Sequence, residues 1–151
     1  VGLTNMGCTC YMNSLMQQFY MMPQFRRAIL GIPSATVENP PGLKKPPESS
    51  AKNLLLQMQS MYAYLHESDR QAILPADFVG ANNADPGVQM DVDEFLLQLC
   101  DRIEENLKNS PHADILKRVW CGTTASQLIG RGQGCSHQRE REEVFYTVPL
   151  D

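Results

Sequence analysis

The sequence predicts an α+β fold in a single domain, with helices in the first part of the chain and strands in the last. Apolar residues recur at helical spacing in several segments up to residue 107. After residue 119, short runs rich in β-branched and aromatic residues flank a glycine-rich turn. Helices followed by strands are typical of the α+β class. A chain of 151 residues is long enough for one domain with a substantial core and too short for two.

The first fifteen residues predict a polar, glycine-containing loop that leads into a helix. Met12, Leu15, Met16 and Phe19 follow at helical spacing, which places Cys10 in the first turn. Unpaired backbone N–H groups and the positive end of the helix dipole stabilise a thiolate at that position. This loop therefore predicts a cysteine nucleophile.

Two other residues of the loop suit the same chemistry. Gly7 allows a tight turn and leaves room for a substrate backbone. Asn5 lies five residues before Cys10, where its side-chain amide can donate a hydrogen bond to an oxyanion. Spacing alone also leaves a structural role open, because many helical cysteines are simply small buried hydrophobic residues.

The following segments predict two helices and a loop. Pro23 favours the start of a short helix that ends at Gly31. Residues 32–50 contain five prolines among Gly, Ser and Lys, which predicts an exposed loop without a regular element. A helix is expected from Ala51 to about Glu67. Its methionine-rich apolar stripe suits either a core or an adaptable binding groove, and a core-facing role is favoured. The stripe comprises Leu54, Met58, Met61 and Leu65, flanked by Leu55 and Tyr62.

Residues 73–78 predict an extended segment that enters a turn, and residues 82–87 are dense in turn-forming residues. A helix of about four turns is then expected to end near Leu107. Its predicted apolar face comprises Val92, Phe95, Leu96, Leu99, Ile103 and Leu107. Acidic residues crowd its first turn, where they can cap the helix, bind a basic peptide, or do both.

The last part of the chain predicts one more short helix at 111–118 and then strands. Residues 119–124 and 127–129 look extended, residues 130–134 form a turn, and residues 144–148 give the clearest strand signal.

Two motifs resemble signatures of the ubiquitin-specific protease family of deubiquitinases, also called USP/UCH-type deubiquitinases. Residues 2–14, Gly-Leu-Thr-Asn-Met-Gly-Cys-Thr-Cys-Tyr-Met-Asn-Ser, resemble the family's cysteine box. The resemblance implies that Cys10 is the nucleophile and that Asn5 helps to form the oxyanion hole. Cys8 stands where the family usually has Asn or Ala, and it precedes the helix start. We therefore do not expect Cys8 to be the nucleophile.

The second motif is Gln-Met-Asp-Val-Asp-Glu-Phe-Leu at residues 89–96, which resembles the family pattern Gln-x-Asp-Ala-x-Glu-Phe-Leu. By this resemblance, Gln89, Asp91 and Glu94 would bind the extended, arginine-bearing C-terminus of ubiquitin. Asp93 falls at a variable position of the pattern, so we do not include it in the site.

The resemblance also implies a papain-like cysteine protease architecture. Residues 1 to about 118 would form the helical thumb, with the Pro-rich loop at 32–50, and residues 119–151 the first strands of the β-fingers. The palm, with its catalytic histidine, is expected beyond residue 151, because His66, His112 and His137 lack the Gly-His-Tyr-like context. We expect this part of the catalytic domain to be inactive, or nearly so, by itself.

No cofactor and no metal are predicted. Cys135 and His137 form one close pair of metal-binding side chains, but a structural zinc site needs four ligands, usually as two pairs. Gly132 stands where the resemblance leads us to expect an earlier cysteine.

Composition narrows the partners and the location. A net charge of −4 argues against nucleic acid as the main partner, and the sequence has no apolar run of membrane-spanning length and no signal peptide. The five cysteines form no regular disulfide framework, which favours reduced thiols in the cytoplasm or nucleus.

The leading functional hypothesis is a thiol-dependent deubiquitinase that acts on ubiquitin or ubiquitinated proteins and hydrolyses the bond after the C-terminal glycine of ubiquitin. The alternative is a catalytically dead, ubiquitin-binding pseudoenzyme. A third hypothesis, a plain helical interaction domain with structural cysteines, does not account for two family motifs in the right order.

Overall fold

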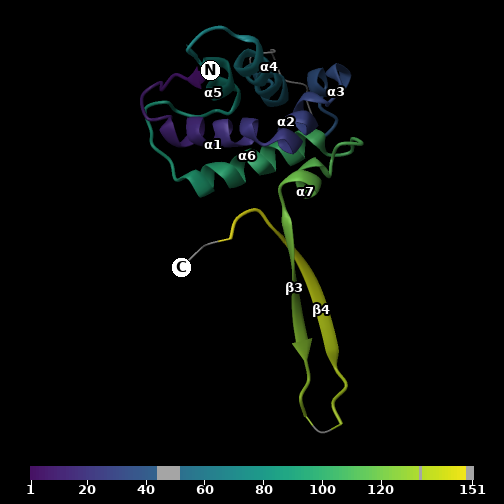
Figure 1. The fold of residues 1–151 in the computed structure, drawn as a ribbon. Helices are drawn as coiled ribbons and strands as arrows, with labels where there is room; N and C mark the ends of the chain where they lie inside the picture. The colour runs from purple at the N-terminus through teal and green to yellow at the C-terminus, as the bar shows by residue number, and fades with distance from the viewer. Residues whose placement is uncertain (44–51, 133, 149–151) are drawn as a thin grey trace.

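The computed structural model describes residues 1–43, 52–132 and 134–148. Figure 1 shows a helical body from which a long two-stranded ribbon projects. In chain order the elements are β1 (Gly2–Leu3), α1 (Cys10–Met21), α2 (Pro23–Leu30), α3 (Ser34–Glu38), α4 (Leu54–Glu67), β2 (Ala72–Ile73), α5 (Ala76–Ala81), α6 (Val92–Leu107), α7 (Ile115–Val119), β3 (Gly122–Ile129) and β4 (Gln138–Phe145). This order, with helices first and the long strands last, fits the predicted α+β class.

Helix α1 lies at the centre of the helical body. Its predicted inward residues Met12, Met16 and Phe19 are fully buried, and Leu15 is partly buried. The ring of Phe19 stacks on Phe25 of α2, with ring centroids 4.2 Å apart. Burial of such a face stabilises the helix far more than intrinsic helix propensity does.

The predicted second helix is confirmed. Helix α2 starts at Pro23, whose fixed φ suits a first helical residue and whose missing N–H costs nothing there. It buries Phe25 and Ile29 and ends before Gly31, as expected.

The expectation of an irregular stretch from 32 to 50 is wrong for its first part. Residues Ser34–Glu38 form α3, and Val37 is only 1% exposed. Pro33 occupies the N-cap position with extended backbone, so this proline starts a helix instead of preventing one. The rest of the prediction falls partly on residues 44–51, which lie outside the described residues.

Helix α4 begins at Leu54, three residues later than predicted, because Asn53 caps it. The Asn53 side-chain oxygen accepts a hydrogen bond from the Leu56 N–H at 3.1 Å, and its Nδ2 donates to the Val37 carbonyl. The predicted apolar stripe is buried along its whole length, which confirms the core-facing role.

The extended segment predicted near residue 73 is confirmed as β2, but the residues after it are not a simple turn. They form α5, which buries Phe78 and Val79. A six-residue helix is too short to show a clear 3.6-residue period in the sequence, so periodicity does not detect it.

Helix α6 confirms the second long amphipathic helix, with one correction. Phe95, Leu96, Leu99, Ile103 and Leu107 are buried, whereas Val92 is 42% exposed and does not belong to the core face. Val92 is the first helical residue, and the residues on either side of it, Asp91 and Asp93, are exposed as well. The predicted helix at 111–118 is shorter and shifted, because residues 111–114 form turns before α7.

Strands β3 and β4 form an antiparallel ribbon in register from Gly122 opposite Phe145 to Ile129 opposite Gln138. Strand β3 is therefore continuous, and β4 begins six residues before the predicted Val144 and ends at Phe145. Both faces of the projecting ribbon are solvent-exposed along most of its length, so the charged run 139–143 can form a strand without any burial cost.

A side-chain hydrogen bond joins the base of the ribbon to the helical body. The Tyr146 hydroxyl donates a hydrogen bond to a carboxylate oxygen of Glu104 in α6 at 2.7 Å. Burial, followed by the hydrogen bond to Glu104, raises the pKa of Tyr146, so this phenol stays protonated at neutral pH.

A short parallel pair of strands holds the start of the chain. Gly2 and Leu3 in β1 pair with Ala72 and Ile73 in β2. The Thr4 N–H continues the pairing by donating to the Ile73 carbonyl at 2.9 Å. The loop that follows therefore leaves from a fixed point on the helical body.

Candidate active site

The loop between β1 and α1 approaches a second loop very closely. The Cys8 N–H donates to the Pro86 carbonyl at 2.7 Å. Gly7 has a φ of +132°, and a Cβ at Gly7 would lie 2.7 Å from that same carbonyl oxygen. Only glycine fits both the backbone conformation and the space, as the sequence suggested for a tight turn.

Asn5 accepts several hydrogen bonds with one atom. Its Oδ1 accepts from the Gly7 N–H at 3.2 Å, from the Thr9 N–H at 3.1 Å and from the Thr9 hydroxyl at 3.0 Å. Across the described ranges, the Nδ2 of Asn5 has no hydrogen-bond acceptor. The exposed amide is therefore oriented with its oxygen toward the loop and its N–H groups available to a ligand.

Cys10 is the first residue of α1, and it is exposed. The helix has no side-chain cap, and the Cys10 N–H has no acceptor among the residues that the structure describes. An unpaired N–H at a helix start favours a negative charge beside it. The structure thus places an accessible thiol, an unpaired N–H and an oriented amide in one loop and its adjoining helix turn.

The neighbouring phenol is neutral. Burial raises the pKa of Tyr11, and negative charge on Cys10 and on Cys8 raises it further. The Tyr11 hydroxyl therefore stays protonated at neutral pH and adds no charge to the site.

The other thiols lie in different surroundings. Burial raises the pKa of Cys100 to about 12, and burial also raises the pKa of Cys121. Both remain neutral at pH 7, as structural thiols do. Cys8 is half-buried before the helix start, and Cys135 is exposed near the tip of the ribbon, far along the chain from the cysteine loop.

The predicted tail-binding residues gather at the start of α6. Asp91 is the N-cap, and its Oδ1 accepts from the N–H groups of Asp93 at 2.8 Å and Glu94 at 3.3 Å. One carboxylate oxygen of Glu94 accepts from the Gln98 side chain at 3.2 Å. Gln89, Asp91 and Glu94 are all exposed. Capping is thus one role of Asp91, and its exposed carboxylate remains accessible to a ligand.

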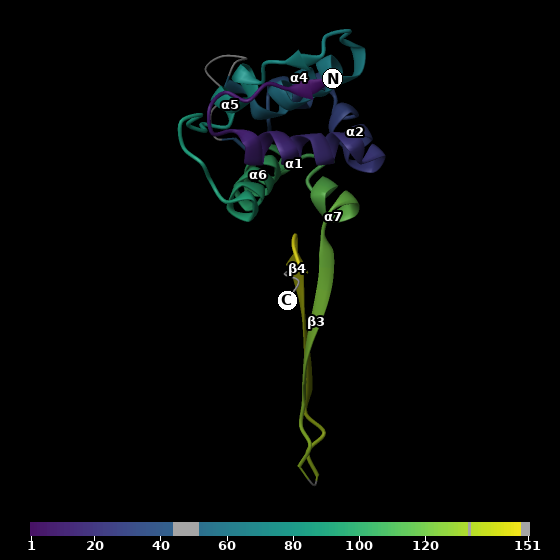
Figure 2. The ribbon, with the colours of Figure 1, turned by 60° about the vertical axis from the view of Figure 1, so that its left-hand side comes forward.

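The structure brings the two motifs together. Figures 1 and 2 show that α1 and α6 begin at the same side of the helical body. The rings of Tyr11 and Phe95 meet edge to face, with centroids 5.3 Å apart. Next to them lies a hollow of about 240 Å³ between the start of α1, the loop that contains Met90, and α6. Tyr11 and Phe95, more than eighty positions apart in the sequence, therefore line one face.

The three histidines lie in separate places. His66 is near the end of α4, within 3.4 Å of the Tyr20 hydroxyl, His112 precedes α7, and His137 adjoins β4. In the described parts of the chain, none of them has a hydrogen bond or ion pair with Cys10.

Within the described residues, no three His, Cys, Asp or Glu side chains are grouped to hold a metal ion. The described helices also include none with the length and apolar character needed to cross a membrane.

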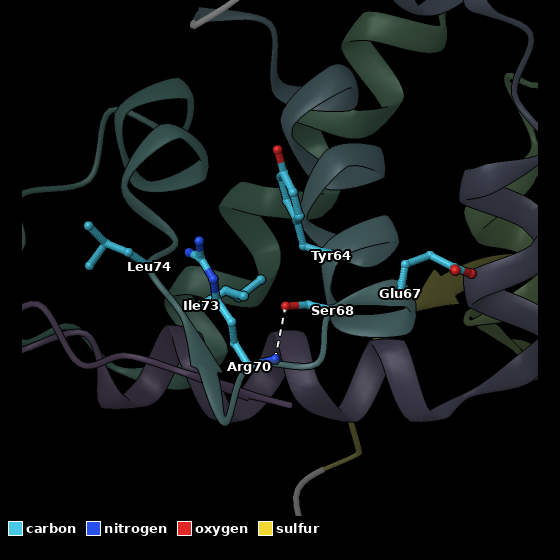
Figure 3. A pocket seen from close by; sticks show the side chains of 6 residues that line it. All are labelled: Tyr64, Glu67, Ser68, Arg70, Ile73 and Leu74. Carbon is cyan, nitrogen blue, oxygen red and sulfur yellow. Dashed lines mark hydrogen bonds between the residues drawn. The ribbon is translucent and has the colours of Figure 1, made fainter.

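A second hollow, of about 540 Å³, lies between the end of α4 and β2 (Figure 3). Tyr64 and Leu74 flank it, and Arg70 and Glu67 supply its charges. The Arg70 N–H donates to the Ser68 hydroxyl at 3.2 Å. The residues that line it include no cysteine, so it does not belong to the candidate active site.

Sequence reasoning missed three residues that build the site. Thr9 is completely buried and bonds to Asn5. The Asn13 side chain donates to the carbonyls of Leu3 and Thr4, and Pro86 accepts from Cys8. Thr9 and Asn13 lie inside the cysteine box, which was a usable signal, whereas only the tertiary structure reveals Pro86.

Replacing Gly7 by alanine is expected to lower the free energy of unfolding by about 1–3 kcal/mol. The φ of Gly7 is strained for a residue with a Cβ, and the added Cβ would meet the Pro86 carbonyl. Denaturant unfolding measures the change. The matched control is Gly80→Ala in α5, where a Cβ meets nothing within 4 Å. Equal stability of the Gly7→Ala and Gly80→Ala variants would contradict the close approach at Gly7.

Several known proteins are similar in sequence to this chain. The family model described as ubiquitin carboxyl-terminal hydrolase matches residues 1–144. Ubiquitin carboxyl-terminal hydrolase puf of Drosophila melanogaster is 36% identical over 98% of this chain and 4% of its own length. Human ubiquitin carboxyl-terminal hydrolase 34 is 33% identical over 98% of this chain and 4% of its own length, and human ubiquitin carboxyl-terminal hydrolase 9Y is 31% identical over 100% and 7%. The chain thus spans less than a tenth of these relatives. Because the family model matches residues 1–144 and these relatives align with almost the entire chain, the chain belongs to the ubiquitin carboxyl-terminal hydrolase family.

Proposed function

We propose that this chain supplies the nucleophile and part of the ubiquitin-binding groove of a thiol-dependent deubiquitinase. The observation that carries the proposal is the exposed Cys10 at the start of α1, beside an Asn5 amide whose oxygen is held by three hydrogen bonds. This arrangement combines an accessible nucleophile with donors for an oxyanion.

In the proposed reaction, the Cys10 thiolate attacks the carbonyl carbon of the C-terminal glycine of ubiquitin. The carbonyl oxygen becomes an oxyanion that accepts hydrogen bonds from the Cys10 N–H and the Asn5 Nδ2. Collapse of this intermediate expels the amine, which takes up a proton, and leaves a thioester on Cys10. Water then hydrolyses the thioester, which releases ubiquitin with a free C-terminal carboxylate and regenerates the thiol. A histidine that accepts the thiol proton and then protonates the leaving amine would complete the reaction.

The ubiquitin tail is proposed to run past the start of α6. Gln89, Asp91 and Glu94 are exposed there, on the same side of the body as the start of α1. Two carboxylates and an amide suit an extended peptide that bears arginine side chains. The proposal includes a papain-like architecture, in which the helical body would be the thumb and the β3–β4 ribbon the start of the fingers.

Replacing Glu94 by glutamine is expected to raise the KM for a ubiquitin substrate about tenfold with little change in kcat, because a charge-assisted bond to the tail is lost. Steady-state kinetics measures both constants. Asp93→Asn is the matched control, because Asp93 lies in the same first turn and has the same effect on the helix dipole. A similar KM for the two variants would remove Glu94 from the tail site.

The test of the function is hydrolysis of a ubiquitin C-terminal amide that carries a fluorescent leaving group, by the complete natural protein that contains this chain. Turnover that depends on Cys10 supports the deubiquitinase. Ubiquitin binding without turnover supports the pseudoenzyme, and the absence of both refutes a ubiquitin-directed function.

A further inference from the structure

Thr9 is linked to both groups that the proposed reaction uses, to Asn5 by hydrogen bonds and to Cys10 by the chain. It precedes Cys10 in the chain, and it is 0% exposed even though both Asn5 and Cys10 are exposed. A buried threonine at this point has no contact with a substrate. Its influence on the reaction can only pass through its neighbours.

The hydroxyl of Thr9 joins two parts of the loop. It accepts a hydrogen bond from the Met6 N–H at 3.0 Å and donates to the Asn5 Oδ1 at 3.0 Å. The Thr9 N–H donates to the same oxygen at 3.1 Å. Two of the three hydrogen bonds that fix the Asn5 amide therefore come from one residue.

These bonds also decide which end of the amide faces outward. The two backbone N–H groups on Oδ1 are obligatory donors, so the opposite orientation would direct the Asn5 NH₂ group against them. The Thr9 hydroxyl adds a third donor and restricts the remaining rotation of the side chain. The Nδ2 is thus held where it can donate to a ligand.

We propose that Thr9 is a positioning residue whose hydroxyl holds the Asn5 amide in the orientation that stabilises the oxyanion. The inference rests on the proposed function and deepens it. The helix turn that begins with Cys10 is continuous with Thr9, and the Asn13 N–H donates to the Thr9 carbonyl at 2.9 Å. Thr9 therefore sets the position of the oxyanion donor relative to the nucleophile.

Removing the hydroxyl leaves the Met6 N–H without its acceptor and the Asn5 side chain with one bond fewer. Because the Asn5 amide is then only partly preorganised, the variant stabilises the transition state less and binds the substrate as well as before. We expect Thr9→Val, which keeps the shape of the side chain, to lower kcat about tenfold with KM unchanged. Thr9→Ser keeps the hydroxyl and is expected to stay within about twofold of the wild type.

A double-mutant cycle tests whether Thr9 acts through Asn5. In the complete natural protein, kcat and KM for a ubiquitin C-terminal amide are measured for the wild type, Thr9→Val, Asn5→Ala and the double variant. The expected result is that Thr9→Val lowers kcat about tenfold in the wild type and less than twofold when Asn5 is already alanine. Thermal unfolding of each variant shows that it is folded, and Thr9→Ala replaces Thr9→Val if the valine variant does not fold.

Two results would overturn the inference while leaving the deubiquitinase intact. One is an unchanged kcat in Thr9→Val, and the other is an equal loss in both backgrounds, which would mean that Thr9 acts independently of Asn5. A wild-type protein that hydrolyses no ubiquitin amide would instead refute the proposed function, and with it the role of Thr9. The wild-type rate therefore separates the two failures.

Discussion

Replacing Cys10 by alanine is expected to lower the kcat for ubiquitin amide hydrolysis by about 10⁴-fold or more, because covalent catalysis has no substitute once the nucleophile is lost. Cys10 is the exposed thiol at the first residue of α1, beside an unpaired N–H. Rates of the purified complete protein, measured with a fluorogenic ubiquitin amide, give the ratio directly.

Cys8→Ala is the matched control, two residues away in the same loop. The Cys8 side chain is half-buried. The backbone N–H of Cys8 donates a hydrogen bond to the Pro86 carbonyl, and an alanine at this position keeps that bond. We expect this variant to retain activity within about threefold. A large loss of activity in Cys8→Ala, together with full activity of Cys10→Ala, would show that Cys8 and not Cys10 is the nucleophile.

Asn5 is expected to have the second largest effect. Asn5→Ala should lower kcat by about 10²–10³-fold, the usual result of removing one oxyanion donor. It also removes the acceptor of three hydrogen bonds within the loop, so part of its effect arises from a loosened structure.

Asn5→Asp separates the two contributions. Aspartate keeps an oxygen for the three loop hydrogen bonds but replaces the donating NH₂ group by a carboxylate oxygen. We expect this variant to be about as stable as the wild type in thermal unfolding and to be at least as inactive as Asn5→Ala. Full activity of Asn5→Asp would show that the side-chain amide is not an oxyanion donor.

The sequence predicts the long helices well because each buries a full amphipathic face. The stripes of α1, α4 and α6 appear in the sequence at helical spacing, and apart from the partly buried Leu15 and the exposed Val92 they are buried in the structure. The short helices α3 and α5 are too brief for a period to show, and each is preceded by a proline that also suits a loop. Length and neighbouring residues therefore decide which helices a sequence reveals.

The ribbon illustrates a different limit. Every residue of the run 139–143 is charged, and local propensity does not predict a strand there. Pairing with β3 makes it one, because the antiparallel register extends the ladder to Gln138 and neither face has to be buried. The composition of a segment alone therefore does not reveal which strand it will pair with.

The sequence predicts the chemically active residues of the candidate site better than the residues that hold them in place. Cys10, Asn5 and the acids of α6 follow from two motifs, and the structure places their elements on one side of the body. The contact between Cys8 and Pro86 joins loops far apart in the chain, and no local pattern indicates it. Thr9 is invisible to hydrophobic periodicity, because it is a polar residue buried by hydrogen bonds.

The most direct test of Cys10 as the nucleophile is to locate a covalent adduct. The complete natural protein is mixed with ubiquitin that carries an electrophile at its C-terminus, and peptide mass spectrometry identifies the modified residue. We predict an adduct on Cys10 that persists in Cys8→Ala and is lost in Cys10→Ala. An adduct on another cysteine, or ubiquitin that binds without reacting, would contradict the assignment.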